Sequence, residues 1–325
     1  MRVRPALLAL ACVASCAAPP AGRPVERVTI PPGASVGVVA DSLESHGIVR
    51  TSGWFRLLTR LRGSERRLKA GIYDLPRDLG AWGAITALQA GRVATTRFTA
   101  PEGLSLLDLA ALVESRLGID ADSVAVAARE SPWLTELAVG REDLEGFLQP
   151  ETYTLPLPLT ARSVVSAMAG GFGRSWRPEW DRRLDSLGLS RTELVTLASI
   201  VEAEAREAEE RPVIAGVYHN RLRRGMLLQA DPTVQYAIQR ATGRRKSRLY
   251  FKDLEIASPY NTYQRAGLPP GPINSPGLGS IEAALYPADV PWLYFVAGAA
   301  GRHVFSRTLR EHNNAIAALR RSGTR

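Results

Sequence analysis

The chain has 325 residues, enough for two or three domains, and its hydrophobic and charged fractions of 45% and 22% are typical of a folded protein. Its formal net charge is +9, but the basic residues, almost all arginines, are scattered and form no basic helix with interleaved aromatic residues. This pattern argues against nucleic acid as a partner. A diffuse positive charge instead suits a polyanionic wall or an anionic membrane surface.

Residues 1–16 have the features of a secretory signal. Two arginines precede the apolar residues 5–15, a stretch too short to cross a bilayer, because a span needs about 20 residues. Both cysteines, Cys12 and Cys16, lie here, and Val13-Ala-Ser-Cys16 is similar to the lipobox of bacterial lipoproteins. The resemblance implies cleavage before Cys16 and lipid attachment to its thiol. The alternative is an ordinary signal peptide cut near Ala17.

Residues 17–27 contain three prolines and are predicted to form a linker. A short strand at 28–30 follows, then a helix from Ser35 to Gly47, a second helix at 52–63, and a strand within 68–75. This order of strand, helix, helix and strand resembles a LysM module, a small fold that binds peptidoglycan glycan, over residues 28–95. A similar strand, turn and helix recur weakly at 97–117, where a common local unit is a better explanation than a true repeat.

The helix that begins at Ser190 carries the main candidate for chemistry. Ser190 opens a capping box, and we expect the helix to continue to about Glu210, ending in a group of solvated carboxylates. Glu204 lies at the border of its apolar face, whereas Glu202 lies about 200° away and nearer solvent. Poor solvation raises a carboxyl pKa, so Glu204 is the better candidate for an acid. The alternative is a structural ion pair between Glu204 and an arginine such as Arg211.

Polar and aromatic residues gather after this helix. A further helix is predicted from Pro212 to Gly225, and residues 257–277 form a long turn-rich loop. Hydroxyl, amide and aromatic groups hydrogen-bond and stack on sugars, and long ordered loops are usually functional. For Asp231, which precedes a proline, capping of a helix is an equal alternative to a role in binding. The candidates for substrate binding, expected to share one cleft with Glu204, are Asn220, Gln229, Asp231, Tyr260, Asn261 and Tyr263.

These stretches together resemble the endolytic murein transglycosylases of the YceG type, known as MltG. Order and spacing of the motifs agree from about residue 28 to the end. The resemblance implies an α+β fold, with the small LysM-like module followed by a YceG-type catalytic domain at 96–325. The principal matching motifs are Leu144-Glu-Gly-Phe-Leu-Gln-Pro-Glu-Thr-Tyr153, Ala198-Ser-Ile-Val-Glu-Ala-Glu204, Val217-Tyr-His-Asn-Arg-Leu222, Leu228-Gln-Ala-Asp-Pro-Thr233, Ser258-Pro-Tyr-Asn-Thr-Tyr263 and Gly267-Leu-Pro-Pro-Gly-Pro-Ile273.

The resemblance implies a reaction with one acid/base residue, which the motif assigns to Glu204. That residue protonates the glycosidic oxygen between N-acetylmuramic acid and N-acetylglucosamine, then helps the muramyl 6-hydroxyl close into a 1,6-anhydro sugar. In lytic transglycosylases a small residue follows the catalytic glutamate, but alanine follows both Glu202 and Glu204. The alternatives are a hydrolytic muramidase and a non-catalytic peptidoglycan-binding envelope protein.

The resemblance also implies a cellular context. Nascent peptidoglycan strands are the implied substrate, penicillin-binding glycan synthases the implied partners, and no cofactor is expected. The family's transmembrane helix is replaced here by the lipoprotein-like signal. We therefore expect a cell-envelope protein held on a membrane by its N-terminus and facing the periplasm or extracytoplasmic side. The four histidines, His46, His219, His303 and His312, are too scattered to predict a metal site, and His219 is not expected to be a general base.

Overall fold

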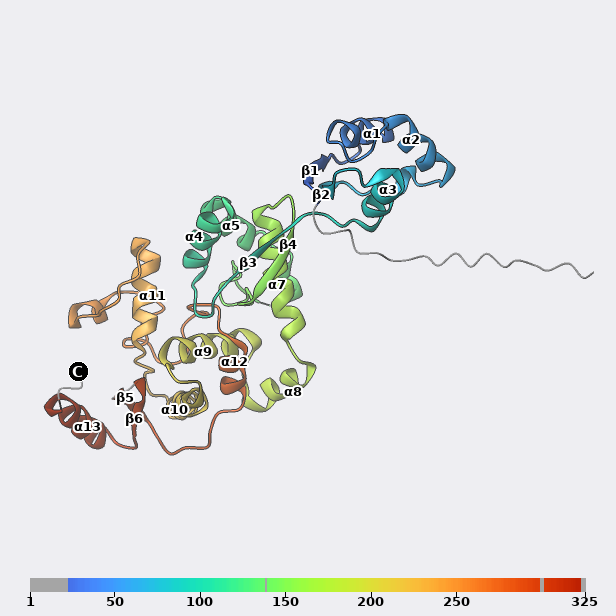
Figure 1. The fold of residues 1–325 in the computed structure, drawn as a ribbon. Helices are drawn as coiled ribbons and strands as arrows, with labels where there is room; N and C mark the ends of the chain where they lie inside the picture. Colours follow the sequence, from blue (N-terminus) through green and yellow to red (C-terminus); the bar gives the residue numbers. More distant parts are fainter. Residues whose placement is uncertain (1–22, 138, 299–300, 323–325) are drawn as a thin grey trace, which may run out of the picture. The chain divides into compact units, whose positions relative to one another are not determined.

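A computed structural model describes residues 23–137, 139–298 and 301–322 of the chain. The predicted signal, the lipidation candidate Cys16 and most of the predicted linker lie outside the described residues. The chain divides into two compact units (Figure 1). Among the described residues, the N-terminal unit comprises 23–95 together with 156–158, and the C-terminal unit comprises those from 96 to 155 and from 159 to 322.

The N-terminal unit is built on one antiparallel pair of strands. Its first strand starts at Val25, inside the predicted linker, and Val28 pairs with Tyr73 in the second. Two helices lie between these strands in the chain, in the expected order, and a further helix that the sequence had not indicated follows. Whether this unit is a LysM module stays a prediction. The elements are β1 (Val25–Ile30), α1 (Val36–Ser45), α2 (Ser52–Leu61), a 3₁₀ turn (Glu65–Arg67), β2 (Gly71–Pro76) and α3 (Gly80–Ala90).

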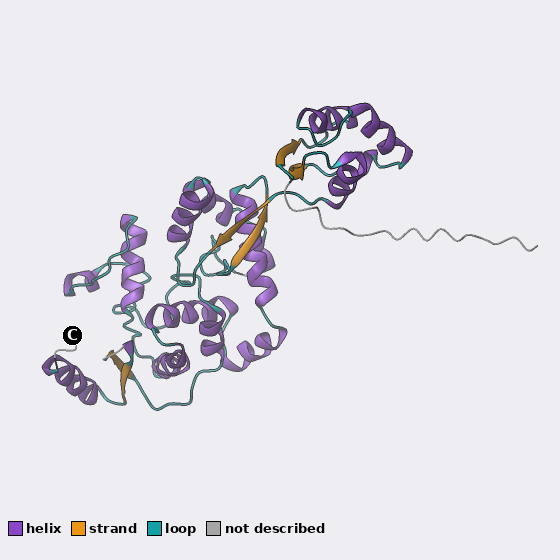
Figure 2. Cartoon of the chain, in the orientation of Figure 1, coloured by secondary structure: helices purple, strands orange, loops and turns teal. Residues whose placement is uncertain are grey.

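The C-terminal unit is mostly helical, with short two-stranded sheets (Figure 2). The mixed content confirms the predicted α+β class. The longer elements from residue 95 onward are β3 (Thr95–Thr99), α4 (Leu106–Leu117), α5 (Ala121–Arg129), α6 (Trp133–Glu136), β4 (Thr152–Pro156), α7 (Ala161–Ser175), α8 (Pro178–Leu187), α9 (Arg191–Glu204), α10 (Arg211–Arg223), α11 (Asp231–Thr242), α12 (Leu278–Leu285), β5 (Tyr294–Ala297), β6 (His303–Ser306) and α13 (Leu309–Arg321).

Helix α9 lies at the centre of the C-terminal unit and packs against α8, α10, α11 and α12. The predicted capping box is present, with the Ser190 backbone N–H donating to Glu193 at 2.8 Å. Every residue from 194 to 201 is buried, so the helix is enclosed on all sides rather than along one face. The Ser199 hydroxyl accepts a hydrogen bond from the backbone N–H of Ile273 at 3.0 Å, which fixes the long polar loop against the helix.

The predicted end of this helix was wrong. Helix α9 ends at Glu204, because Ala205 adopts an extended backbone with ψ of 121°, and the chain then turns into α10. The expected solvated carboxylate end does not form either. The two carboxylate oxygens of Glu210 lie 2.9 and 2.7 Å from the backbone nitrogen and Nδ1 of His303. Glu204 is therefore the last residue of a buried helix and not part of its middle.

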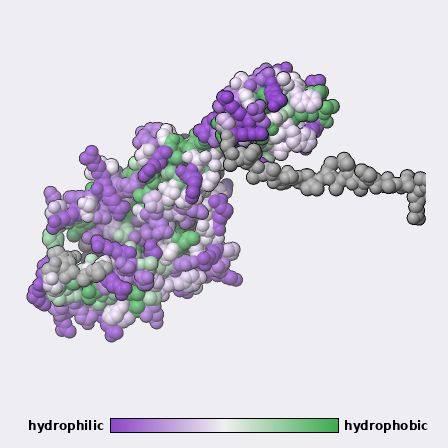
Figure 3. Space-filling view, viewed as in Figure 1, coloured by the Kyte–Doolittle hydropathy of each residue, from purple (hydrophilic) through white to green (hydrophobic). Residues whose placement is uncertain are grey.

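Hydrophilic side chains cover much of the visible face of the C-terminal unit (Figure 3). In the described residues, we find no helix with the length and apolar composition that a membrane span requires.

Candidate active site

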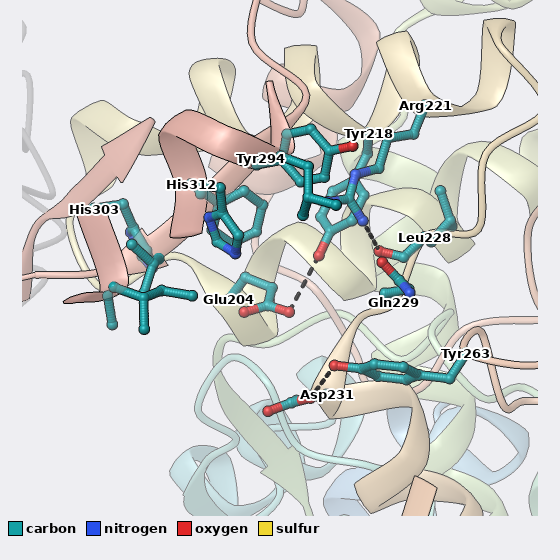
Figure 4. Close-up of a pocket in the computed structure, with 15 residues that line it drawn as sticks. Glu204, Tyr218, Arg221, Leu228, Gln229, Asp231, Tyr263, Tyr294, His303 and His312 are labelled. Atoms are coloured by element: carbon teal, nitrogen blue, oxygen red, sulfur yellow. Dashed lines mark hydrogen bonds between the residues drawn. The ribbon is translucent and has the colours of Figure 1, made fainter. Parts of the chain in front are cut away.

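A cleft of about 400 Å³ opens beside the end of α9. Its walls come from six parts of the C-terminal unit: the end of α9, helix α10, the segment that leads into α11, the polar loop, the hairpin formed by β5 and β6, and helix α13 (Figure 4). The lining residues are Glu204, Tyr218, Arg221, Leu228, Gln229, Asp231, Tyr263, Tyr294, Phe295, Val296, Ala297, His303, Leu309, His312 and Ile316.

Glu204 lies on the wall of this cleft and is half-buried. Burial raises the pKa of its carboxyl to about 7, and the negative charge of Asp231 acts in the same direction. The Tyr218 hydroxyl, which donates to Glu204 Oε1 at 3.1 Å, and the charge of Arg221 both lower this pKa. A carboxyl with these properties exists in both protonation states near neutral pH, as a group that donates and then accepts a proton must.

Glu202 has a different environment. Its Oε2 accepts hydrogen bonds from Ser280 Oγ at 2.7 Å and from the backbone N–H of Gly277 at 3.1 Å. Its Oε1 lies 3.7 Å from Arg211 Nη2. The ion pair with Arg211 that we considered for Glu204 therefore belongs to Glu202. Glu202 is not among the residues that line the cleft, and its contacts hold the start of α12 against α9.

Arg221 fixes the wall behind Glu204. Its Nε donates to the Leu293 carbonyl at 2.7 Å, and its Nη1 donates to the Leu228 carbonyl at 2.7 Å. The guanidinium carbon lies 5.2 Å from the ring centroid of Tyr294. These contacts join α10 to β5 and to the segment before α11, while leaving a positive charge beside the cleft.

Asp231 and Gln229 both line the cleft, as expected. Asp231 Oδ1 accepts a hydrogen bond from the Tyr263 hydroxyl at 2.6 Å, and Tyr263 also lines the cleft. Asp231 does not cap α11: it occupies the first helical position after Ala230, which makes no side-chain capping bond. Gln229 has a positive φ of 49°, a conformation that is strained for a residue with a side chain and is often found at functional sites.

Three predicted binding residues are not among the residues that line the cleft, and the structure gives each of them partners within the protein. Asn220 Nδ2 donates to two main-chain carbonyls, at 2.7 and 2.9 Å, in the segment before β5. The Tyr260 hydroxyl instead accepts from Arg141 Nη2 at 2.8 Å. Asn261 is fully buried, and its Nδ2 donates to the carbonyls of Leu254 and Ile256, each at 2.9 Å. In all three, the polar side chain satisfies partly buried backbone or arginine groups, and sequence alone does not distinguish this role from substrate binding.

The sequence argument also missed residues that line the cleft, chiefly Tyr218, Arg221 and Tyr294. Tyr218 and Arg221 stand in the motif that contains Asn220, three residues apart on α10, and so share one face of it. That spacing was a usable signal. The sequence held no such signal for the β5–β6 hairpin and α13. These elements lie about a hundred positions after Glu204 in the chain, and only the folding of the chain brings them to the same cleft. His219 is buried on α10, and its Nε2 lies 2.8 Å from the carbonyl oxygen of Ala284.

No group of three or more potential metal ligands occurs within the described part of the chain. The cleft offers instead one poorly solvated carboxyl, a second carboxylate, a guanidinium and several aromatic rings. This set of groups can transfer a proton and bind a polar ring.

Known proteins of similar sequence match nearly the whole chain. The model of the YceG-like family matches residues 28–318. An endolytic murein transglycosylase of Bacillus subtilis (strain 168) is 33% identical over 308 residues, which cover 89% of this chain and 83% of that protein. An endolytic murein transglycosylase of Streptococcus pneumoniae serotype 2 (strain D39) is 31% identical over 319 residues, covering 89% of this chain and 57% of that longer protein.

A solved structure agrees with these sequence matches. The crystal structure of a yceG-like protein from Listeria monocytogenes superposes with a TM-score of 0.61 at 32% identity, covering 90% of this chain and 98% of that one. The family model and the aligned relatives each match most of the chain. The chain therefore belongs to the YceG-like family.

Proposed function

We propose that this chain is an endolytic lytic transglycosylase of peptidoglycan, which cuts glycan strands between N-acetylmuramic acid and N-acetylglucosamine. The observation that carries the proposal is Glu204, a half-buried carboxyl on the cleft wall whose pKa of about 7 suits both proton donation and proton acceptance. The names of the relatives from Bacillus and Streptococcus support the same activity.

The proposed reaction uses Glu204 twice. In its protonated form, Glu204 gives its proton to the glycosidic oxygen, and the bond from that oxygen to the muramyl anomeric carbon breaks. The resulting carboxylate then takes the proton of the muramyl 6-hydroxyl, whose oxygen bonds to the same carbon. The product is a 1,6-anhydro ring, no water is consumed, and Glu204 is protonated again. Arg221 and the Tyr218 hydroxyl stabilise the carboxylate between these steps.

A hydrolytic muramidase is the second candidate, and one observation favours it. Asp231 is a second carboxylate in the same cleft, and glycoside hydrolases use a carboxylate pair. In that case Asp231 would direct water to the anomeric carbon. Because Tyr263 donates a hydrogen bond to Asp231, the carboxylate would also be held in a fixed orientation.

Mass spectrometry of the products separates the two reactions. Purified glycan strands are incubated with the wild-type chain and with Glu204→Gln, and the fragments are analysed for their reducing ends. Anhydro ends, one water lighter than hydrolysed ends, are expected from the wild type alone. Fragments of intermediate length should appear before single disaccharides if cleavage is endolytic. Ordinary reducing ends would instead identify a muramidase.

We further propose that the chain is held on a membrane of the cell envelope by lipid on Cys16, with glycan synthases of the penicillin-binding class as partners. The lipobox-like sequence and the family resemblance support these assignments. On the same basis, the N-terminal unit would bind glycan as a LysM-like module. Lipid at Cys16 is tested by metabolic labelling with a fatty acid analogue, which Cys16→Ala should abolish.

A further inference from the structure

Helix α2 of the N-terminal unit carries an exposed apolar stripe. Its inner face buries Phe55. On another face, Trp54, Leu57 and Leu61 are 56%, 46% and 72% exposed. Their spacing of three, four and seven residues places them along one side of the helix. Apolar surface of this unit is visible at the end where α2 lies (Figure 3).

A second exposed tryptophan lies close to the end of α2. Trp82, on α3, is 61% exposed, and the guanidinium of Arg62, which follows α2, lies 3.8 Å from its ring centroid. Helices α2 and α3 pack against each other. Large apolar side chains that gather in this way on the surface of a protein usually mark a site of contact with a partner or a membrane.

Positive charge adjoins the stripe. Arg66, Arg67 and Lys69 follow α2, are exposed, and together line one shallow surface hollow. None of the three forms an ion pair within the described residues. By contrast, Arg60 on α2 lies 3.7 Å from Glu65. Arg67 Nη2 donates to the carbonyl of Arg62 at 3.3 Å, which places it next to the residue that covers Trp82. The positive charges of Arg66, Arg67 and Lys69 are thus not neutralised by a carboxylate and can attract an external anion.

We propose that this face, defined by Trp54, Leu57, Leu61, Trp82 and the cations Arg66, Arg67 and Lys69, docks onto the surface of an anionic lipid membrane. A helix with tryptophan and leucine on one side and basic residues beside it is suited to lie in the plane of the interface. Its apolar side chains enter the boundary of the acyl chains, and its cations contact lipid phosphates.

The N-terminal sequence favours a membrane over other partners. Six residues, 17–22, separate the candidate lipid site from the start of the described chain, and they span at most about 20 Å when extended. The proposal extends the proposed membrane anchoring but does not require lipid on Cys16. A glycan strand fits this face less well, because Leu57 and Leu61 offer no hydrogen-bonding group to the hydroxyls of a sugar.

Spin labelling of the whole chain tests the proposal. Leu57→Cys is introduced after Cys12 and Cys16 are changed to serine, so the result depends neither on lipid attachment nor on Glu204. The matched control is Leu107→Cys on α4 of the C-terminal unit, since Leu107 is 44% exposed against 46% for Leu57. A nitroxide at each site is exposed to oxygen, which enters bilayers, and to a nickel chelate, which does not.

Mixed vesicles of phosphatidylglycerol and phosphatidylcholine should lower the nickel collision rate at position 57 by about threefold relative to position 107, with a rise in oxygen collisions. Phosphatidylcholine alone, or high salt, should give a smaller change, because the cations then contribute little. Arg66→Glu with Lys69→Glu should abolish the protection. Equal nickel accessibility at both positions with every vesicle would overturn the proposal. Protection of position 57 by glycan strands but not by vesicles would also overturn it and assign the face to glycan.

Discussion

The hydroxyl of Tyr218 is expected to set the pH at which Glu204 loses its proton. Tyr218 is buried and remains protonated, because burial and the neighbouring Glu204 raise its pKa well above the usual value. Its hydroxyl therefore acts as a fixed donor to Glu204 Oε1, at 3.1 Å. A donor stabilises the ionised carboxylate, so its removal in Tyr218→Phe should raise the pKa of Glu204. The ring, which packs edge-on against Phe295 with centroids 5.8 Å apart, stays in place.

The size of the shift follows from the energy of the bond. A hydrogen bond to a charged group contributes about 1.5–3 kcal/mol, and one pKa unit corresponds to about 1.36 kcal/mol. Glu204 opens onto the cleft, where water can replace part of the lost bond, so the lower value applies and the expected rise is about one unit. The pKa of Glu204 should therefore move from about 7 towards about 8.

The assay is the pH dependence of kcat/KM for cleavage of soluble glycan strands. Glu204 must be protonated to start the reaction, so the alkaline limb of the profile follows its pKa. In Tyr218→Phe this limb should move to higher pH by about one unit. Tyr260→Phe, which removes a hydrogen-bonded hydroxyl outside the cleft lining, is the matched control and should leave the limb in place. An unchanged alkaline limb in a folded Tyr218→Phe protein would refute this account of Glu204.

Glu204→Gln should lower the rate of cleavage by more than about a hundredfold and leave the midpoint of thermal unfolding unchanged. Glu202→Gln should mainly lower that midpoint, because Glu202 holds α12 against α9. If activity and melting measurements gave the reverse pattern, the roles of the two residues would be exchanged. Asn220→Ala should lower the free energy of unfolding in urea by about 0.5–1.5 kcal/mol, because two partly buried carbonyls lose their donor. A change in KM alone would return Asn220 to the site. Glu145 is buried, and burial raises the pKa of its carboxyl to about 8. The folded chain therefore holds this proton more tightly than the unfolded chain, and the resulting stability is complete in acid and is lost as the pH rises to about 8. The free energy of unfolding should therefore fall between about pH 5 and 8, and Glu145→Gln should flatten that slope; equal slopes in both proteins would contradict the assignment.

The sequence by itself determined where several helices begin or stop and which carboxyl is the main acid candidate, but it did not determine the end of α9 or the presence of α3. The capping box at Ser190 and the glycine stop at Gly47 depend on contacts within a few residues, which the chain order already fixes. The position of Glu204 beside apolar neighbours is likewise a matter of helical spacing, and burial does raise its pKa. The α+β class followed from the same local patterns and from the motifs that resemble the YceG-type proteins.

Only the tertiary structure decided which polar residues face the cleft. Asn220 and Arg221 are adjacent in one motif, yet Asn220 binds the chain before β5 and Arg221 lines the cleft beside Glu204. Neighbouring residues on a helix point about 100° apart, so their partners depend on which distant segments pack there. For the same reason Tyr263 lines the cleft while Asn261 is buried beneath the loop. The wall from β5 to α13 is formed entirely by such long-range packing, which no local pattern in the sequence encodes.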